Sequence, residues 1–312
     1  MRIVFMGTPQ AAVPSLERIV NDGHEVAAVY TQPDKPAGRG SKIAFSPVKK
    51  LALLHNLPIY QPAKIRTPEA LQEFMSHKAD GVVVVAYGRI LPETFLQGFP
   101  KGAINVHFSL LPKYRGAAPV NWAIANGENR TGVTTMQMDA GLDTGDILLQ
   151  RETRIEPEET SIDLMERLSF TGADLLSETL AMYDELFPEP QNNEEATLAP
   201  IMKREDGLID WENTAARLCD RARGFQPFPT AFTFHKGQKL TIWKGKPVLG
   251  FVSKISRVGE ILDAKSDSLS VLCGDGTVLG IEELQLEGKR RMSTRDFLNG
   301  ASIQIGEKLG RS

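Results

Sequence analysis

Asn105 and His107 stand two residues apart in the run AINVHFSLLP, which begins at Ala103. The apolar residues of this run predict a strand over 103–107, and residues two apart on a strand point to the same face. The pair would lie at the end of that strand, where open α/β sheets bind their ligands. An Asn amide can donate a hydrogen bond to a developing oxyanion, and a His can do the same or transfer a proton near neutral pH. The pair alone fits either an oxyanion site or a buried Asn and His that only satisfy the core.

A second polar run, DAGLDTGD over 139–146, holds three carboxylates and two glycines between two predicted strands. Asp143 lies at its tip, where Gly141 and Gly145 allow the backbone to turn sharply. A carboxylate beside the Asn–His pair would orient the His or accept a proton from an attacking nucleophile. The residues leave a second interpretation open, in which this run is a polar hairpin whose aspartates cap backbone groups.

The residues after His107 form a stiff apolar turn, Leu110-Leu111-Pro112, which suits the binding of a flat ring system. A dinucleotide cofactor is disfavoured, because residues 7–9, which follow the first predicted strand, do not begin a G-x-G-x-x-G motif. The phosphate-loop spacing G-x-x-x-x-G-K-[ST] is also absent from the glycine-rich loop over 34–42.

That loop, DKPAGRGSK, carries three cations, Lys35, Arg39 and Lys42, and two glycines. It follows a predicted strand and would emerge at the same sheet edge as the candidate site. A mobile basic loop in that place suits an anionic partner such as nucleic acid. The alternative is an exposed loop that contacts only solvent.

Alternating strands and helices in the first half must position these residues. Strands are predicted over 2–6, 25–30, 81–86, 103–107, 133–139 and 147–155, and helices over about 15–23, 47–55, 68–77 and 119–127. Ser46-Pro47 and Thr67-Pro68 are typical helix starts, with a capping side chain followed by proline. This alternation predicts a doubly wound, Rossmann-like α/β domain.

The second half changes character. A long amphipathic helix is predicted after a Thr160–Asp163 cap pair, with one apolar face at leucines 164, 168, 175, 176, 180 and 186, and with an end at Pro188 and Pro190. Residues 189–206 are polar and lack a period, which is typical of a linker. Residues 207–312 hold a short helix and five or six short predicted strands, which suggest a small OB-like β-barrel. We therefore expect an α/β domain over 1–188, a linker over 189–206 and a barrel over 207–312.

Composition narrows the class of protein. The 312 residues are 24% charged and 41% apolar, a balance that excludes long disorder and coiled coil as the main architecture. The longest apolar run, VVVVAY at 82–87, is far shorter than the roughly 20 residues of a transmembrane helix, and the N-terminus shows no signal peptide. Two cysteines, Cys219 and Cys273, cannot build a disulfide framework or a zinc site, so we expect no metal site and a reducing, cytoplasmic location.

The charge is unevenly distributed along the chain. Residues 1–206 carry 20 Lys and Arg against 27 Asp and Glu, whereas residues 207–312 carry 16 against 12. A basic C-terminal part is consistent with a polyanionic partner, and chance variation in surface charge explains it equally well.

Taken together, these stretches resemble the folate-dependent formyltransferase family. The resemblance rests on Asn105-x-His107-x-Ser109-Leu110-Leu111-Pro112 with Asp143 about 35 residues later. It extends over the whole chain through the opening MGTP, the loop DKPAGRGSK, the segments VVVVAYGRILP and KREDGLIDW, and the β-rich C-terminal part. The basic loop and the C-terminal part are similar to those of family members that act on tRNA.

The resemblance implies transfer of a formyl group from 10-formyltetrahydrofolate to the α-amino group of methionyl-initiator tRNA. It implies that Asn105, His107 and Asp143 are catalytic. It further implies that Ser109, Leu110, Leu111 and Pro112 line the folate pocket and that Arg39 and Lys42 bind tRNA together with the C-terminal domain. We expect a monomer without a redox cofactor or structural metal, with Mg²⁺ assisting only through the tRNA.

Two alternatives remain at this point. A non-catalytic RNA-binding protein is disfavoured by the intact Asn105, His107 and Asp143. A sugar-nucleotide formyltransferase would share those three residues and can carry a β-rich extension. The basic loop and the basic C-terminal part favour tRNA over a sugar nucleotide as the acceptor.

Overall fold

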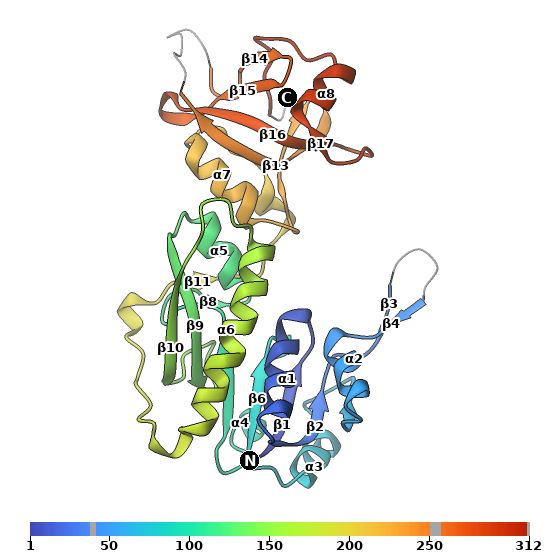
Figure 1. Cartoon of the computed structure of the whole chain (residues 1–312), viewed down its shortest axis with the longest axis vertical. Helices are drawn as coiled ribbons and strands as arrows, with labels where there is room; N and C mark the ends of the chain where they lie inside the picture. The colour runs from blue at the N-terminus through green and yellow to red at the C-terminus, as the bar shows by residue number, and fades with distance from the viewer. Residues whose placement is uncertain (38–41, 250–256, 311–312) are drawn as a thin grey trace. The chain divides into compact units, whose positions relative to one another are not determined.

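The computed structural model describes residues 1–37, 42–249 and 257–310. They form two compact units (Figure 1). The first unit comprises Met1–Pro119, Arg130–Arg154 and Met165–Ala199, and the second comprises Val120–Asn129, Ile155–Leu164 and Pro200–Ser312. The units are not continuous in sequence, and the predicted domain boundaries at residues 188 and 206 stay a prediction.

A seven-stranded sheet forms the centre of the first unit. Its strands are β1 (Arg2–Gly7), β2 (Glu25–Tyr30), β5 (Ile59–Tyr60), β6 (Gly81–Val85), β7 (Ala103–His107), β9 (Arg130–Gln137) and β10 (Ile147–Arg154). The order is β10-β9-β7-β6-β1-β2-β5, with parallel pairing from β7 to β5 and antiparallel pairing at β9 and β10. The predicted α/β fold with a mostly parallel sheet is confirmed.

Four helices lie between these strands in the first unit: α1 (Val13–Asn21), α2 (Pro47–Leu54), α3 (Pro68–Ser76) and α4 (Glu93–Leu96). Most of α5 (Pro119–Ala125) and the first turn of α6 (Ser161–Ala181) belong to the second unit, and the rest of α6 belongs to the first. Val4 of β1 packs with Phe74 of α3 and Phe95 of α4. Its neighbour Phe5 points to the opposite face of the sheet and is just as fully buried. Both faces are therefore covered, as the continuous apolar strands predicted. Across the described residues, no helix combines the length and apolarity that crossing a membrane requires.

The predicted helix starts are confirmed by their caps. The Ser46 hydroxyl accepts a hydrogen bond from the Lys49 N–H at 3.1 Å, and the Thr67 hydroxyl accepts one from the Ala70 N–H at 3.2 Å. Each cap satisfies one of the backbone donors that a helix start leaves unpaired.

The predicted end of α6 at Pro188 was wrong. The helix ends at Ala181, and a 3₁₀ turn over Tyr183–Glu185 follows. The Tyr183 hydroxyl is fixed between the Lys101 carbonyl oxygen at 2.8 Å and Gln137 Oε1 at 2.9 Å, which turns the chain off the helix axis. Leu186 therefore lies outside the apolar face, whereas the five preceding leucines of that face are buried.

The segment that the sequence predicted to be a linker is docked on the first unit over its first part. Glu189 and Ile147 exchange both backbone hydrogen bonds at 2.8 Å. Strand β11 (Leu198–Ala199) pairs in parallel with β8 (Arg115–Gly116). A polar, aperiodic sequence predicted no such pairing, because backbone donors and acceptors leave no residue signature.

The basic loop begins and ends in a short antiparallel hairpin, β3 (Lys35–Ala37) and β4 (Lys42–Ala44), where the sequence predicted an open loop. Its base is held by Asp34, which forms an ion pair with Lys49 and accepts a hydrogen bond from Gln61 Nε2 at 2.9 Å. Hydrogen bonds from Lys49 and Gln61 keep the pKa of the Asp34 carboxyl below its ordinary value.

The second unit contains a six-stranded antiparallel sheet. Its strands are β12 (Ala231–His235), β13 (Gln238–Val248), β14 (Ile261–Lys265), β15 (Ser268–Leu272), β16 (Val278–Leu286) and β17 (Met292–Ser293), with helices α7 (Ala215–Gly224) and α8 (Thr294–Gly300). The order is β12-β13-β16-β15-β14, and β17 lies beside β16. Leu218 of α7 and Phe297 of α8 share a buried core with the inward side chains of the sheet.

The last described residues connect the two edge strands of this sheet. Gly310 N donates to the Phe234 carbonyl oxygen of β12 at 2.9 Å, while Ile261 N of β14 donates to the Glu307 carbonyl oxygen at 2.8 Å. The C-terminal segment thereby bridges both edges, which fits the predicted small barrel-like domain.

Glu307 adds a charged contact to this closure. Its carboxylate lies 2.7 Å from Lys236 Nζ and 2.7 Å from His235 Nε2, and these hydrogen bonds lower the pKa of Glu307 to about 2. A carboxyl with a lowered folded-state pKa stabilises the fold above its ordinary pKa, and that stabilisation is lost as the pH falls toward the folded value.

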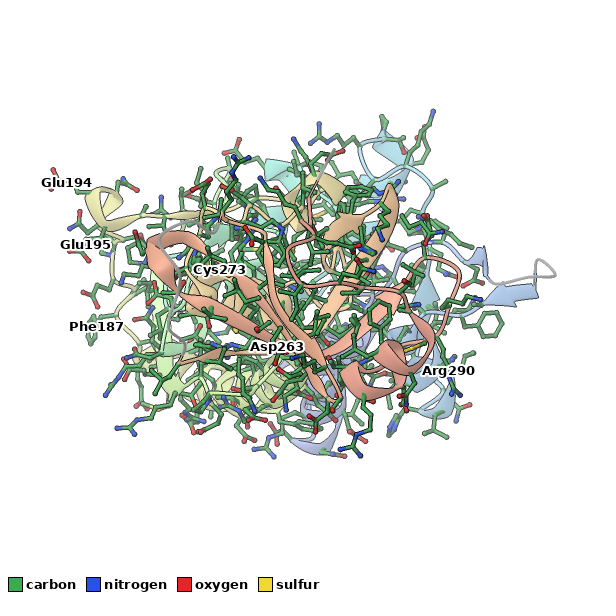
Figure 2. The ribbon with its side chains drawn as sticks, turned by 90° about the horizontal axis from the view of Figure 1, so that it is seen from above. Phe187, Glu194, Glu195, Asp263, Cys273 and Arg290 are labelled. Atoms are coloured by element: carbon green, nitrogen blue, oxygen red, sulfur yellow. The ribbon has the colours of Figure 1, made fainter. Side chains whose placement is uncertain are left out.

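We predict that Glu307→Gln lowers the Tm by about 1–3 °C at pH 7, a small effect because the contact is partly exposed and screened. The difference from the wild type should shrink as the pH falls from about 4.5 to about 2. Thermal unfolding of both proteins across that range measures it. Glu194→Gln is the control, since Glu194 is exposed and its side chain points away from the ribbon (Figure 2). A Tm difference that does not change with pH would contradict the assignment.

Candidate active site

Asn105 is placed by β7, which lies between parallel β6 and antiparallel β9. The residue is only 8% exposed. The amide forms no hydrogen bond with any of the described residues, and its atoms are not among the fully buried, unpaired side-chain atoms of those residues, so it keeps access to solvent. An accessible amide without a partner among the described residues is available to a ligand that enters the site.

His107, at the end of β7, is 5% exposed and is held on both sides. Its Nε2 lies 2.9 Å from the Tyr114 carbonyl oxygen, and its Nδ1 lies 3.6 Å from Asp143 Oδ2. A carbonyl oxygen only accepts, so Nε2 carries a hydrogen and donates to it. The remaining nitrogen therefore faces the Asp143 carboxylate.

Asp143 reaches His107 because the loop between β9 and β10 folds back. Gln137, where β9 ends, pairs with Ile104 near the start of β7, roughly 10 Å before His107 at the rise of a strand. Asp143 itself adopts φ +53°, a left-handed conformation that Asp tolerates better than most residues. Its Oδ2 accepts a hydrogen bond from the Gly116 N–H at 2.8 Å. The structure therefore brings the predicted Asp143 to the predicted His107.

The other two carboxylates of this loop, Asp139 and Asp146, do not face His107 as Asp143 does. Asp139 accepts hydrogen bonds from the Thr144 hydroxyl at 2.7 and 2.8 Å and from the Gly141 N–H at 3.0 Å. Asp146 is exposed. At Gly145, an added Cβ would lie 1.8 Å from the Gln137 carbonyl oxygen, so only glycine permits this close approach. Of the three carboxylates, Asp139 closes the loop and Asp143 faces the site.

The predicted folate-lining turn is fixed before any ligand binds. The Thr134 hydroxyl donates to the Ser109 carbonyl oxygen at 2.7 Å and accepts from the Leu111 N–H at 3.1 Å. Ser109 and Leu111 are buried, whereas Leu110 and Pro112 are partly exposed. A preformed turn lowers the entropy cost of ligand binding.

At the carboxyl edge of the sheet, hydrogen bonds join the loops that follow β1, β2 and β6. The Tyr87 carbonyl oxygen, after β6, accepts from the Thr8 hydroxyl at 3.2 Å and from Gln32 Nε2 at 3.1 Å. Arg89 extends this network by donating to Gln32 Oε1 at 3.0 Å. Ligands of open α/β sheets bind at this edge, where the strand order reverses.

A cavity of about 460 Å³ opens beside these loops. It is lined by three cationic side chains and three others: Lys64, Arg66, Arg89, Ile65, Thr67 and Ile90. Its size is that of a small-molecule site, and its cations suit an anionic group.

The predicted tRNA contacts are not placed by the structure. Arg39 lies outside the described residues, and the side chain of Lys42 is not described.

The sequence predicted no role for Tyr114, Arg115 and Gly116, although the run KYRGAAP follows the apolar turn directly. It also missed Gln191, which no sequence signal distinguishes from the rest of the polar segment.

Comparison with known proteins identifies the family. A model of the formyl transferase family matches residues 1–180, and a model of the formyl transferase C-terminal domain matches residues 201–302. The chain belongs to the formyl transferase family. Together the two matches leave out only residues 181–200 and 303–312, so they cover both the α/β fold and the barrel-like part.

Full-length relatives support the same assignment for this formyl transferase. The chain is 52% identical to "Methionyl-tRNA formyltransferase" of Koribacter versatilis (strain Ellin345) over 314 residues, covering 100% of this chain and 99% of that protein. It is 47% identical to the protein of the same name from Alkaliphilus oremlandii (strain OhILAs), covering 99% of this chain and 100% of that protein.

Solved structures share the fold of this formyl transferase. An N-formyltransferase from Helicobacter canadensis, in complex with folinic acid and dTDP-3-aminofucose, aligns with a TM-score of 0.68 at 21% identity, covering 89% of this chain and 98% of that one. HypX from Aquifex aeolicus in complex with tetrahydrofolic acid aligns with a TM-score of 0.64 at 17% identity, covering 100% of this chain and 51% of that one.

If Asn105 donates to the developing oxyanion, as the sequence predicts, Asn105→Ala should lower the kcat of formyl transfer by about 10²–10³-fold. The free energy of unfolding should change by less than about 1 kcal/mol, since the amide bonds to none of the described residues. Steady-state kinetics and denaturant unfolding measure the two effects.

Asn121→Ala is the matched control, because the Asn121 amide donates to the Gly224 carbonyl oxygen at 2.8 Å. That variant should lose stability and keep its kcat. A normal kcat together with lost stability in Asn105→Ala would show that Asn105 only serves the core.

Proposed function

We propose that the chain transfers a formyl group from 10-formyltetrahydrofolate to the α-amino group of methionyl-initiator tRNA, giving formylmethionyl-tRNA for translation initiation. The full-length match to relatives of that name supports the acceptor. The unpartnered Asn105 amide beside the His107–Asp143 pair is the observation that carries the chemistry.

The cavity beside the carboxyl-edge loops supports a folate donor. Lys64, Arg66 and Arg89 line it, and the glutamate part of a folate carries carboxylates that such cations attract. We assign the flat ring system of the donor to the apolar turn formed by Ser109, Leu110, Leu111 and Pro112.

Formyl transfer requires attack of a neutral amine on the formyl carbon of the donor. The carbonyl oxygen of the formyl group becomes an oxyanion in the tetrahedral intermediate, and Asn105 would donate a hydrogen bond to it. His107 would donate as well once the substrate oxygen replaces the Tyr114 carbonyl oxygen as the acceptor of its Nε2 hydrogen. The intermediate then collapses, and the C–N bond to the folate breaks.

The attacking nitrogen must lose a proton, and the folate nitrogen must gain one. Asp143 would accept the proton from the amine directly or through water, and His107 would carry it toward the leaving nitrogen. The Gly116 N–H bound to Asp143 Oδ2 leaves the other carboxylate oxygen for this step.

A tRNA acceptor is a polyanion, which accounts for the positive charge of the basic loop and of residues 207–312. Arg39, Lys42 and the basic 207–312 part would contact its backbone and acceptor end. We further propose a cytoplasmic monomer that holds no metal or redox cofactor, with Mg²⁺ acting only through the tRNA.

An amino-sugar nucleotide is the rival acceptor, because the Helicobacter canadensis relative was solved with dTDP-3-aminofucose. We predict a kcat/KM for methionyl-initiator tRNA that is at least about 100-fold above that for an amino-sugar nucleotide. Formyl transfer from 10-formyltetrahydrofolate to each acceptor, measured under the same conditions, decides between them. A preference for the sugar nucleotide would overturn the proposed function.

The basic loop gives a second test. We predict that Arg39→Ala lowers kcat/KM for the tRNA, leaves the KM for the folate unchanged and reduces the dependence of log kcat/KM on log salt by about one unit. Kinetics at several salt concentrations measure this. Arg130→Ala is the control, because Arg130 is exposed and pairs with Glu152. If Arg39→Ala leaves both kcat/KM and its salt dependence unchanged, the loop does not bind the tRNA and contacts only solvent.

A further inference from the structure

Gln191 holds the Asp143 loop from outside. Its Nε2 donates to the Asp143 carbonyl oxygen at 2.9 Å and to the Gly145 carbonyl oxygen at 2.7 Å. These two bonds use both hydrogens of the amide. The side chain therefore fixes the backbone on both sides of Thr144, at the point where the loop returns to His107.

Arg115 orients that amide. Its Nε and one terminal nitrogen donate to Gln191 Oε1 at 3.0 and 2.8 Å, and its other terminal nitrogen donates to Asn193 Oδ1 at 3.0 Å. Arg115 is only 6% exposed. With its oxygen bound to a rigid guanidinium fork, the amide of Gln191 has one orientation, in which its nitrogen faces the loop.

Arg115 also lies between the two backbone groups that contact the His–Asp pair. The carbonyl of Tyr114 accepts from His107 Nε2, and the N–H of Gly116 donates to Asp143 Oδ2. A continuous circuit of contacts therefore runs from His107 through residues 114–116 and Gln191 back to Asp143.

We propose that Gln191 is a positioning residue for formyl transfer, whose Arg115-oriented amide sets the place of the Asp143 carboxylate against His107. This inference rests on the proposed function, which gives Asp143 its part in proton transfer. Small displacements of a reacting group cost large factors in rate, because reaction needs a narrow range of geometries.

The docking of the segment itself does not depend on the Gln191 side chain. Glu189 exchanges two backbone bonds with Ile147, and β11 pairs with β8. Thr197 adds a hydrogen bond from the Tyr114 N–H to its hydroxyl at 2.8 Å. Substitution of Gln191 therefore removes the contacts to the loop and leaves the docked segment in place.

Gln191→Glu is the informative variant, because it keeps an oxygen for Arg115 and loses both donors to the loop. We expect kcat to fall about 10- to 100-fold, with the KM for the folate changed less than about two-fold and the Tm within about 2 °C. Gln191→Met, which loses the donors without adding charge, should show a loss of similar size.

Asn192→Asp is the matched control. It makes the same amide-to-acid change at the next residue, where the side chain contacts Glu194 and Glu195 within its own segment. Figure 2 shows those two glutamates pointing away from the ribbon. Its kcat should stay within about two-fold of the wild type.

The decisive measurement repeats Gln191→Glu in an Asp143→Asn background by single-turnover kinetics. If Gln191 acts through Asp143, the second substitution should cost less than about two-fold there. The same 10- to 100-fold loss in both backgrounds, or a full kcat for Gln191→Glu alone, overturns the inference and leaves the proposed function intact. A full kcat for Asp143→Asn alone contradicts the proposed roles and removes the inference with them.

Discussion

The candidate site depends on one constraint: the loop between β9 and β10 must carry the Asp143 carboxylate back along β7 to His107. Because β9 runs antiparallel to β7, the connection to β10 starts at the wrong end of β7 for a contact with His107. The chain solves this with a loop that doubles back, and the loop needs a glycine at 145, a left-handed Asp143 and an internal Asp139–Thr144 bond. The Gly116 N–H then binds the returned carboxylate, and the Gln191 side chain binds the backbone of the loop.

Asn105 and His107, the two polar residues of β7, differ in the protein contacts that they make before a substrate binds. His107 is hydrogen-bonded at Nε2 to the Tyr114 carbonyl oxygen and has the Asp143 carboxylate 3.6 Å from Nδ1, so protein groups orient its ring before substrate arrives. Asn105 is 8% exposed and its amide has no partner among the described residues, so its donor hydrogens are free for an acceptor. Donors that already face the developing charge stabilise it with little reorganisation. Under the proposed mechanism, Asn105 meets that condition directly, whereas His107 Nε2 must first leave the Tyr114 carbonyl oxygen.

The sequence predicted well what local chemistry determines. The caps at Ser46, Thr67 and Thr160 marked helix starts, and continuous apolar runs marked strands buried on both faces. It also brought Asp143 and His107 forward as candidates from their residue types and neighbours. It failed at the end of α6, where a tertiary contact of Tyr183 ends the helix before any proline does. It failed again at Gln191, whose role depends on a backbone pairing that no side-chain pattern records.

The distance in sequence between Asp143 and Gln191 has a consequence for how the protein matures. All of α6 separates the loop from the residue that fixes it, and β11 separates that residue from the second unit. Contacts between distant residues form late, because a long loop must close before they contribute. During synthesis from the N-terminus, the strands of the sheet and His107 leave the ribosome before residues 189–199 do. We therefore expect the Asp143 loop to gain its Gln191 contacts only after the segment leading to the second unit has been made.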